Sequence, residues 1–223
     1  MANRPVFINS ENSPFCTISN INFTYYSGFA TVQKQKSIAS LHDNFSNAFP
    51  TKKILEISSK SNSELGVNLS AFNLMINSKN KKFSVESAFQ GSKVFELGGP
   101  YSDLIGKDSK IAKKDLRLKN SGRIIGFNYF GRVFPTQPLD YFYNWLYINA
   151  LSLNKDLCEK IIEYDAFTDI EFNPSKSINC QARACAIFVG LKRSNKLEKA
   201  LSSEKDFLNI VYPNQDDYFQ LKF

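Results

Sequence analysis

Apolar residues recur at helical spacing along much of this chain, with shorter strand-like stretches between them. The clearest helical pattern covers residues 33–49, where Ile38, Leu41 and Phe45 lie three or four residues apart and Pro50 ends the run. Further helices are expected at residues 85–97, 109–118, 141–153 and 157–164. Another helix should follow Ser177, which is its expected N-cap. The tail at 196–223 should form two short helices and an aromatic end.

Strands are expected where β-favouring residues occur in short runs. These runs lie at residues 6–8, 21–25, 54–57 and 69–77, with an extended piece at 167–172 and a strand or aromatic loop at 123–135. Because helices dominate, we predict a compact α+β domain with a small sheet. Residues 1–60 would form N-terminal strands and a helix, 65–190 the central region and 191–223 the C-terminal helices, since no repeat or linker marks a domain boundary in the 223 residues.

The predicted helix at 141–153 carries the longest apolar stripe and is expected to be the central packing helix. Asp140 precedes it as the expected N-cap. One face would carry Phe142, Leu146, Asn149, Ala150 and Leu153, and the later helix after Ser177 would turn Ile178, Ala182, Cys185 and Val189 inward.

The predicted helix at 85–97 carries the most suggestive polar pattern. Ser84 is a suitable N-cap, and Glu86, Gln90 and Lys93 fall within roughly 60° of one another on a helix, as expected for positions i, i+4 and i+7. The neighbouring flank is mostly apolar, so this stripe of acid, amide and base borders the side that packs inward. An ordinary amphipathic helix with a favourable first-turn glutamate would show the same pattern.

Composition narrows the partners and excludes several mechanisms. A formal charge of +7 and a pI near 9.1 favour polyanionic partners, although a lysine-rich soluble surface would have the same balance. The four cysteines and His42 lack zinc-site spacing, and no segment is apolar enough for a signal peptide or membrane span, so we expect free thiols, cytoplasmic localisation, no metal and no membrane partner. One histidine gives no support for a Ser-His-Asp triad, and glycine motifs for nucleotides are absent.

The stretch Leu69-Ser-Ala-Phe-Asn73, followed by the segment 83–93, resembles the leading signature of the NADAR family, the YbiA-like N-glycosidases. Residues 109–114 resemble that family's short helix with an Ala-Lys pair, the segment around Trp145 resembles its central helix, and 157–169 followed by 179–183 resembles its closing part. Residues 4–8 and 33–42 resemble the branch encoded beside DarT-type DNA ADP-ribosyltransferase toxins. The chain departs from the wider pattern at Ala71, where Asn is usual, and at 168–171, where a Trp-Gly pair is missing after the late acid.

This resemblance implies an antitoxin that hydrolyses the N-glycosidic bond between ADP-ribose and a guanine base of DNA, without a metal or cofactor. Its partners would be ADP-ribosylated single-stranded DNA, ADP-ribose as product and a cognate toxin. Three alternatives share the resemblance or the basic composition: an N-glycosidase acting on free nucleotide-derived intermediates of the riboflavin-pathway type, a non-catalytic protein that binds DNA or the toxin, and a phage-encoded counter-defence copy.

Such a reaction needs a proton donor for the leaving nitrogen and stabilisation of the reacting carbon, tasks that suit a carboxyl group and an amine. Glu86 is the expected general acid/base, because an apolar flank favours its neutral form. Lys34, Lys36 and Lys93 are the candidate amines, either as a Schiff-base nucleophile or as a cation for the diphosphate. Among late acids the order of the motifs favours Asp169, with Asp165 and Glu171 as rivals.

Substrate binding is expected from residues of the same motifs. Phe72 and Trp145 could stack on a base, although core packing is the favoured role of Trp145, because large aromatic residues dominate cores. Asn73, Gln90 and Lys93 belong to the leading signature, and Asn179, Gln181 and Arg183 open a helix whose N–H groups and guanidinium suit a diphosphate, or simply form a capped surface helix.

Overall fold

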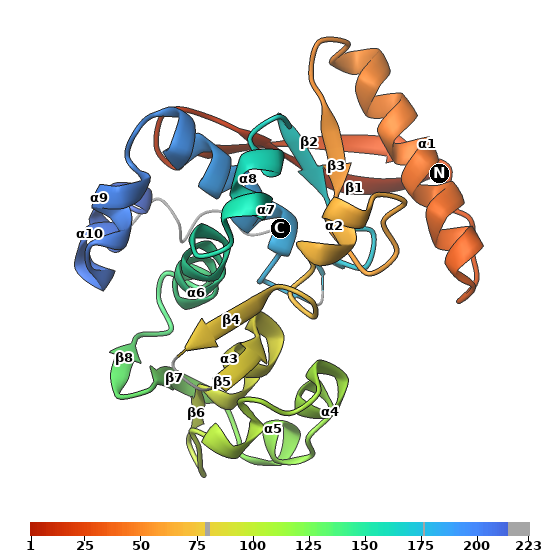
Figure 1. Cartoon of the computed structure of the whole chain (residues 1–223). Helices are drawn as coiled ribbons and strands as arrows, with labels where there is room; N and C mark the ends of the chain where they lie inside the picture. The colour runs from red at the N-terminus through yellow and green to blue at the C-terminus, as the bar shows by residue number, and fades with distance from the viewer. Residues whose placement is uncertain (79–80, 176, 214–223) are drawn as a thin grey trace.

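The computed structural model describes residues 1–78, 81–175 and 177–213 and confirms a compact α+β fold (Figure 1). The helices are α1 (Thr31–Ala48), α2 (Glu64–Asn68), α3 (Val85–Gly91), η1 (Ser102–Leu104), α4 (Ser109–Lys113), α5 (Arg117–Asn120), α6 (Tyr141–Ser152), α7 (Lys155–Ile161), α8 (Gln181–Arg193), α9 (Leu197–Leu201) and α10 (Glu204–Val211). The strands are β1 (Ala2–Asn9), β2 (Cys16–Phe23), β3 (Ile54–Glu56), β4 (Met75–Ser78), β5 (Lys81–Ser84), β6 (Lys93–Phe95), β7 (Ile124–Tyr129), β8 (Arg132–Phe134) and β9 (Ala166–Thr168).

The largest sheet has the strand order β2-β1-β9-β3 and separates two hydrophobic clusters. Strand β1 runs antiparallel to β2 and β9, and β3 runs parallel to β9. Because side chains alternate along a strand, Val6 and Ile8 pack with Ile38 and Leu41 of α1, whereas Phe7 packs on the other face in the main core. Burying each of these side chains contributes about 1.5–3 kcal/mol.

Helix α6 is the centre of the main core and contacts α3, α8 and α10 (Figure 1). Ten of its twelve residues are buried, so the prediction of one apolar face was wrong in part. Leu153, expected inside, is exposed just after the helix, whereas Tyr143 and Tyr147 are buried. Several elements surround the helix, and such a position leaves no polar side to detect in the sequence.

The polar ends of α6 and α8 also differ from expectation. Asp140 makes no N-cap bond to α6 through its side chain; it accepts hydrogen bonds from Tyr212 at 3.0 Å and from the Asn144 side chain at 3.0 Å. Helix α8 begins at Gln181, after the extended residue Cys180, so Ser177 is not its N-cap. At α6 the side chain of Asp140 thus has tertiary partners in place of a cap bond, and at α8 no side chain of the N-cap residue caps the helix.

The helix expected at 85–97 ends early. Helix α3 stops at Gly91, where a Cβ would lie 2.6 Å from Cγ1 of Ile105, and the chain then enters β6, which pairs with β7 from Lys93↔Phe127 to Phe95↔Ile124. Pairing with a distant strand therefore overrode the local helical pattern.

Other elements also begin or end at residues different from those predicted. The strand expected at 69–77 is confined to β4, because residues 69–74 form a turn in which Leu74 N–H donates to the Ser70 carbonyl at 2.8 Å. The helix expected at 109–118 is divided into α4 and α5. Asp108 caps α4 by accepting hydrogen bonds from the N–H groups of residues 110 and 111. The region 123–135 is a hairpin of β7 and β8.

The tail has the two short helices expected, α9 and α10, and its aromatic end, within residues 214–223, lies outside the described residues. In the part of the chain that is described, no helix has both the length and the apolar character needed to cross a membrane.

Candidate active site

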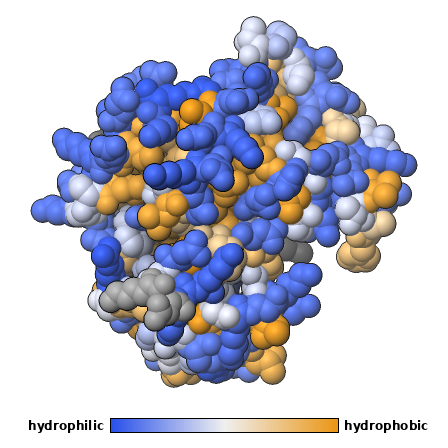
Figure 2. Space-filling view, viewed as in Figure 1, coloured by the Kyte–Doolittle hydropathy of each residue, from blue (hydrophilic) through white to orange (hydrophobic). Residues whose placement is uncertain are grey.

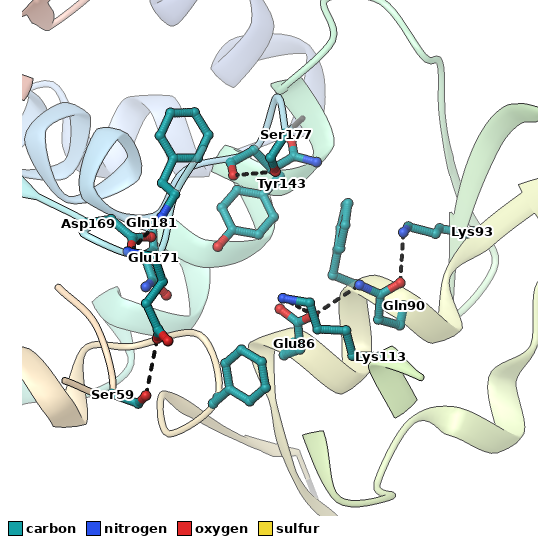
Figure 3. Close-up of a pocket in the computed structure, with 14 residues that line it drawn as sticks. Ser59, Glu86, Gln90, Lys93, Lys113, Tyr143, Asp169, Glu171, Ser177 and Gln181 are labelled. Atoms are coloured by element: carbon teal, nitrogen blue, oxygen red, sulfur yellow. Dashed lines mark hydrogen bonds and ion pairs between the residues drawn. The ribbon is translucent and has the colours of Figure 1, made fainter. Parts of the chain in front are cut away.

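A cavity of about 450 Å³ lies between α3 and α4 on one side and the segment from β9 to the start of α8 on the other. Figure 3 shows the two groups of polar side chains facing each other, with Glu86, Gln90, Lys93 and Lys113 on one wall and Ser59, Asp169, Glu171 and Gln181 on the other. Phe72, Phe89, Tyr143, Phe172, Ser177 and Asn179 complete the lining. Its volume falls in the range of small-molecule sites.

The first wall is built on α3, a short helix whose seven residues are all buried. Ser84 caps it, as predicted, by accepting a hydrogen bond from Ser87 N–H at 3.1 Å, and Ser84 Oγ also bonds to Ser109 Oγ at 2.7 Å. The N–H of Glu86 donates to the Ala71 carbonyl at 2.9 Å. These contacts hold Glu86 at the wall of the cavity, where its residue is only 5% exposed.

A chain of polar contacts runs along this wall. Lys93 Nζ donates to Gln90 Oε1 at 2.7 Å, and Gln90 Nε2 donates to Glu86 Oε1 at 3.0 Å. Lys113 Nζ, from α4, lies 3.5 Å from the same Glu86 oxygen. The amide and the ammonium stabilise a negative charge on Glu86, whereas its burial opposes one.

The two lysines also lie near aromatic rings. Lys93 Nζ is 4.8 Å from the centroid of the Phe89 ring, and Lys113 Nζ is 4.9 Å from that of Phe72. Burial lowers the pKa of Lys93 to about 8, with Lys113 lowering it further and Glu86 acting against the shift. At pH 7 about a tenth of Lys93 is therefore a neutral, nucleophilic amine, and this fraction rises with pH.

The second wall carries two carboxylates from the segment after β9. Asp169 Oδ1 accepts hydrogen bonds from the N–H groups of Glu171 at 3.0 Å and Phe172 at 3.2 Å. Burial raises the pKa of Asp169 well above its ordinary value, and the nearby charge of Glu56 raises it further. Glu171 accepts a bond from Ser59 Oγ at 3.2 Å. A group that can hold a proton thus faces Glu86 across the cavity.

Of the three late acids considered from the sequence, Asp165 lies elsewhere. Its carboxylate pairs with Arg193 at 2.8 Å and accepts the N–H of Lys53 at 2.9 Å. Asp169 and Glu171 both line the cavity.

Gln181 connects the two walls. Its Nε2 donates to the Ile57 carbonyl at 2.6 Å, and its Oε1 accepts from Ala71 N–H at 2.7 Å. Since the Ala71 carbonyl accepts from Glu86, one amide side chain at the start of α8 fixes the turn that positions both Phe72 and Glu86. This role of Gln181 depends on contacts between residues far apart in the chain, which no local sequence pattern indicates.

The structure brings together eight of the site residues considered from the sequence at this cavity: Phe72, Glu86, Gln90, Lys93, Asp169, Glu171, Asn179 and Gln181. The remaining ones are not among the described residues that line it. Lys34 Nζ donates to the Tyr25 hydroxyl at 2.8 Å, and Lys36 Nζ lies 6.0 Å from the centroid of the Tyr26 ring. Both lysines belong to the first turns of α1.

Asn73, Trp145 and Arg183 have structural partners instead. Asn73 Nδ2 donates to the Val67 carbonyl at 2.9 Å and so closes the turn before β4. Trp145 is buried in the core, 4.8 Å from the Phe134 ring centroid to centroid. Arg183 Nε lies 3.2 Å from Asp140 Oδ2 in a largely buried ion pair.

Lys113 and Tyr143 line the cavity but were not selected from the sequence. Lys113 belongs to the Ala-Lys pair of the resemblance, which was the available signal. Tyr143 lies in the apolar pattern of α6 and gives no such signal; its ring packs edge-on against Phe89 at 5.1 Å. Burial, and then the charge of Glu86, raises the pKa of the Tyr143 hydroxyl well above its ordinary value, so it remains a hydrogen-bond donor.

Among the residues that the structure describes, no group of three or more His, Cys, Asp or Glu side chains is arranged to hold a metal ion. The four cysteines are free thiols, of which Cys16, Cys180 and Cys185 are buried.

Comparison with known families matches nearly the whole chain. Residues 2–220 match the family described as DarT1-associated NADAR antitoxin. No curated protein matches the chain.

Proposed function

This chain belongs to the DarT1-associated NADAR antitoxin family, and on that premise we propose that it removes ADP-ribose from guanine bases of DNA by hydrolysing the N-glycosidic bond. The observation that carries the proposal is the chain from Lys93 through Gln90 to Glu86, which faces Asp169 across the cavity. It combines a neutral amine, a carboxylate and a second proton-holding acid in one site.

In the proposed reaction Lys93 is the nucleophile. Its neutral amine adds to C1 of the ring-opened ribose, and the bond from that carbon to the guanine nitrogen breaks as the nitrogen accepts a proton. Water then adds to the resulting imine carbon, and the carbon–nitrogen bond to Lys93 breaks to release free ADP-ribose and the amine. Glu86, held 3.0 Å from the Gln90 amide that also contacts Lys93, acts as general acid/base in these proton transfers.

The other lining residues suit the two ends of the substrate. Lys113, whose side chain is about half exposed at the cavity, would bind the diphosphate. The Phe72 ring offers a flat surface for a base, and the side chain of Asn179 offers hydrogen bonds. Asp169 would hold a proton on the wall opposite Glu86.

The test is release of ADP-ribose from a single-stranded oligonucleotide that carries it on guanine, followed by mass spectrometry. Wild type should release ADP-ribose, whereas Glu86→Gln and Lys93→Ala should lose at least about 100-fold in rate. Borohydride added during turnover should trap a covalent adduct on wild type and none on Lys93→Ala. Lys36→Ala and Lys34→Ala test whether the α1 lysines take part, and the exposed Lys155→Ala on α7 is the matched control.

The alternatives correspond to other outcomes. Turnover of free nucleotide-derived compounds, without release from DNA, would select the free-nucleotide glycosidase. Neutralisation of a cognate toxin in cells by Glu86→Gln would select a non-catalytic antitoxin. A trapped adduct on Lys34 or Lys36 would transfer the nucleophile role to α1.

A further inference from the structure

The segment 107–119, which includes α4 and α5, borders the cavity and is strongly basic. It contains six lysines and arginines against two aspartates. Lys113, on α4, lines the cavity itself, and its neighbours along the chain extend away over the surface. A surface that begins at the cavity is a natural path for the remainder of a long substrate.

The acids near this segment neutralise only part of its charge. Arg117 forms ion pairs with Asp103 at 2.7 Å and with Asp115 at 2.9 Å. Lys107 forms a second ion pair with Asp103, at 3.1 Å. Asp108 is engaged as the N-cap of α4.

Three further lysines have no such partner. Lys110, Lys114 and Lys119 are exposed, and none of them forms an ion pair with any residue that the structure describes. The segment therefore presents uncompensated positive charge on the surface next to the cavity.

Apolar side chains lie among these lysines. Ile111 is 61% exposed and Leu116 is 69% exposed. Together with Lys110, Lys114 and Asp115 they line a shallow surface groove. Figure 2 shows apolar side chains set among hydrophilic ones at the lower right of the molecule, over α4 and α5. Single exposed apolar residues are common, but two in one groove with unpaired lysines suit a ligand that has both charges and flat apolar faces.

The groove is held rigidly in relation to the cavity. Ser109 Oγ donates to the Phe72 carbonyl at 3.0 Å and also bonds to Ser84 Oγ, the cap of the helix that carries Glu86. Helix α4 is thus attached both to the turn that presents Phe72 and to the start of α3. A strand lying along α4 would keep a fixed register with the reacting group.

We propose that this α4–α5 face binds the single-stranded DNA that flanks the modified guanine, with Lys110, Lys114 and Lys119 at phosphates and Ile111 and Leu116 against bases and sugars. The proposal rests on the function proposed above, in that it takes the substrate to be DNA. Charge complementarity with a phosphodiester chain and continuity with the cavity wall through Lys113 support this occupant over an apolar protein surface.

The experiment compares two substrates: guanosine carrying ADP-ribose, and an oligonucleotide of about 12 nucleotides carrying the same modification. The test variant is Lys110→Ala/Lys114→Ala, and the matched control is Lys155→Ala/Lys160→Ala, which removes two exposed lysines from α7. For the oligonucleotide, the test variant should raise KM about 5–10-fold with kcat unchanged, and the slope of log KM against log salt should fall by about 1.4 for two lost phosphate contacts. Kinetics on the modified guanosine should be unchanged.

A second variant separates charge from apolar contact. Ile111→Ser should also raise KM for the oligonucleotide, but it should leave the salt slope as in wild type. The proposal is overturned if Lys110→Ala/Lys114→Ala matches the α7 control on the oligonucleotide. It is also overturned if the variant weakens both substrates equally, or if it loses binding to a cognate toxin while binding to DNA is retained.

Failure of the proposed function would be recognised separately, because wild type would then release no ADP-ribose from the oligonucleotide. Binding of unmodified single-stranded DNA by the full-length protein, followed by fluorescence anisotropy over a range of salt, still tests the face in that case. Equal affinity and salt slope for wild type and Lys110→Ala/Lys114→Ala would overturn the proposal. Weaker binding by the variant, with a salt slope smaller by about 1.4, would support it.

Discussion

Lys93 donates a 2.7 Å hydrogen bond to Gln90, which joins its amine to the Glu86 carboxylate through a single amide. The three residues come from α3 and the first position of β6, so the bend at Gly91 does not separate them. Because an amide has an acceptor and a donor, Gln90 can orient both catalytic candidates at once.

Replacing Gln90 with Leu should therefore harm both stability and turnover. The change removes the amide donor from Glu86, which keeps only the Lys113 ammonium at 3.5 Å, and it removes the acceptor of the Lys93 amine. A buried polar group that loses a hydrogen-bond partner costs about 1–3 kcal/mol. We expect the free energy of unfolding in urea to fall by that amount, and the rate of ADP-ribose release to fall at least about tenfold. Gln35→Leu, on the half-exposed part of α1, is the control and should change neither. Wild-type turnover by Gln90→Leu would show that the amide link is not needed.

The pH dependence of single-turnover rates should report the state of Lys93. Its folded pKa is lowered to about 8 by burial, so the neutral amine increases as pH rises through that value. The rate should rise about tenfold per unit below pH 8 and level off above it. Lys93→Arg keeps a charge but cannot supply a neutral amine, and it should be inactive at every pH. A rate that falls above pH 8 in wild type would instead assign Lys93 a cationic role.

His42 should make stability depend on pH between about 4 and 6.5. Its Nε2 lies 2.8 Å from Thr168 Oγ1, which in turn donates to Glu56 at 2.6 Å, and burial lowers the pKa of His42 to about 4. The unfolded chain binds a proton near pH 6.5 that the folded protein binds only near pH 4, so stability is present above 6.5 and is lost as pH falls through this window.

The full loss from this group amounts to about 3–4 kcal/mol. Urea unfolding between pH 4.5 and 7.5 should show a shallower dependence for His42→Gln than for wild type. The carboxylates contribute to both curves, so the difference isolates His42. Identical slopes would mean that the pKa of His42 is the same in the folded protein as in the unfolded chain.

The ion pair between Asp140 and Arg183 should be structural. Both side chains are largely buried, and Asp140 also accepts from Tyr212 and Asn144. Asp140→Ala removes the charge partner of Arg183, and breaking a buried pair costs about 3–5 kcal/mol. The exposed pair between Lys107 and Asp103 is the contrast, since Lys107→Ala should cost less than about 1 kcal/mol.

Thermal unfolding of the two variants should show this difference. The folded fraction of Asp140→Ala at low temperature should keep the wild-type KM, because Arg183 is not among the described residues that line the cavity. A changed KM would indicate that Arg183 contributes to substrate binding, as predicted from the sequence.

Elements whose pattern repeats over several turns could be predicted from the sequence. Helix α1 was expected within two residues of its bounds, because Ile38, Leu41 and Phe45 form one apolar stripe facing one sheet. The short elements were harder, since α3 ends where Gly91 meets Ile105 and the next residues pair with β7. Local propensity is weak over so few residues, and a distant partner decides the outcome.

The sequence by itself determined the family resemblance, the α+β class and the placement of Glu86 and Gln90 on one helical face, because these depend on residue order and a period of 3.6. Only the tertiary structure decided which charged groups share a cavity. It brought Lys113 and Asp169 to Glu86 from segments far apart in the chain and paired Arg183 with Asp140. Charge–charge contacts depend on distance in space, and no local pattern encodes that distance.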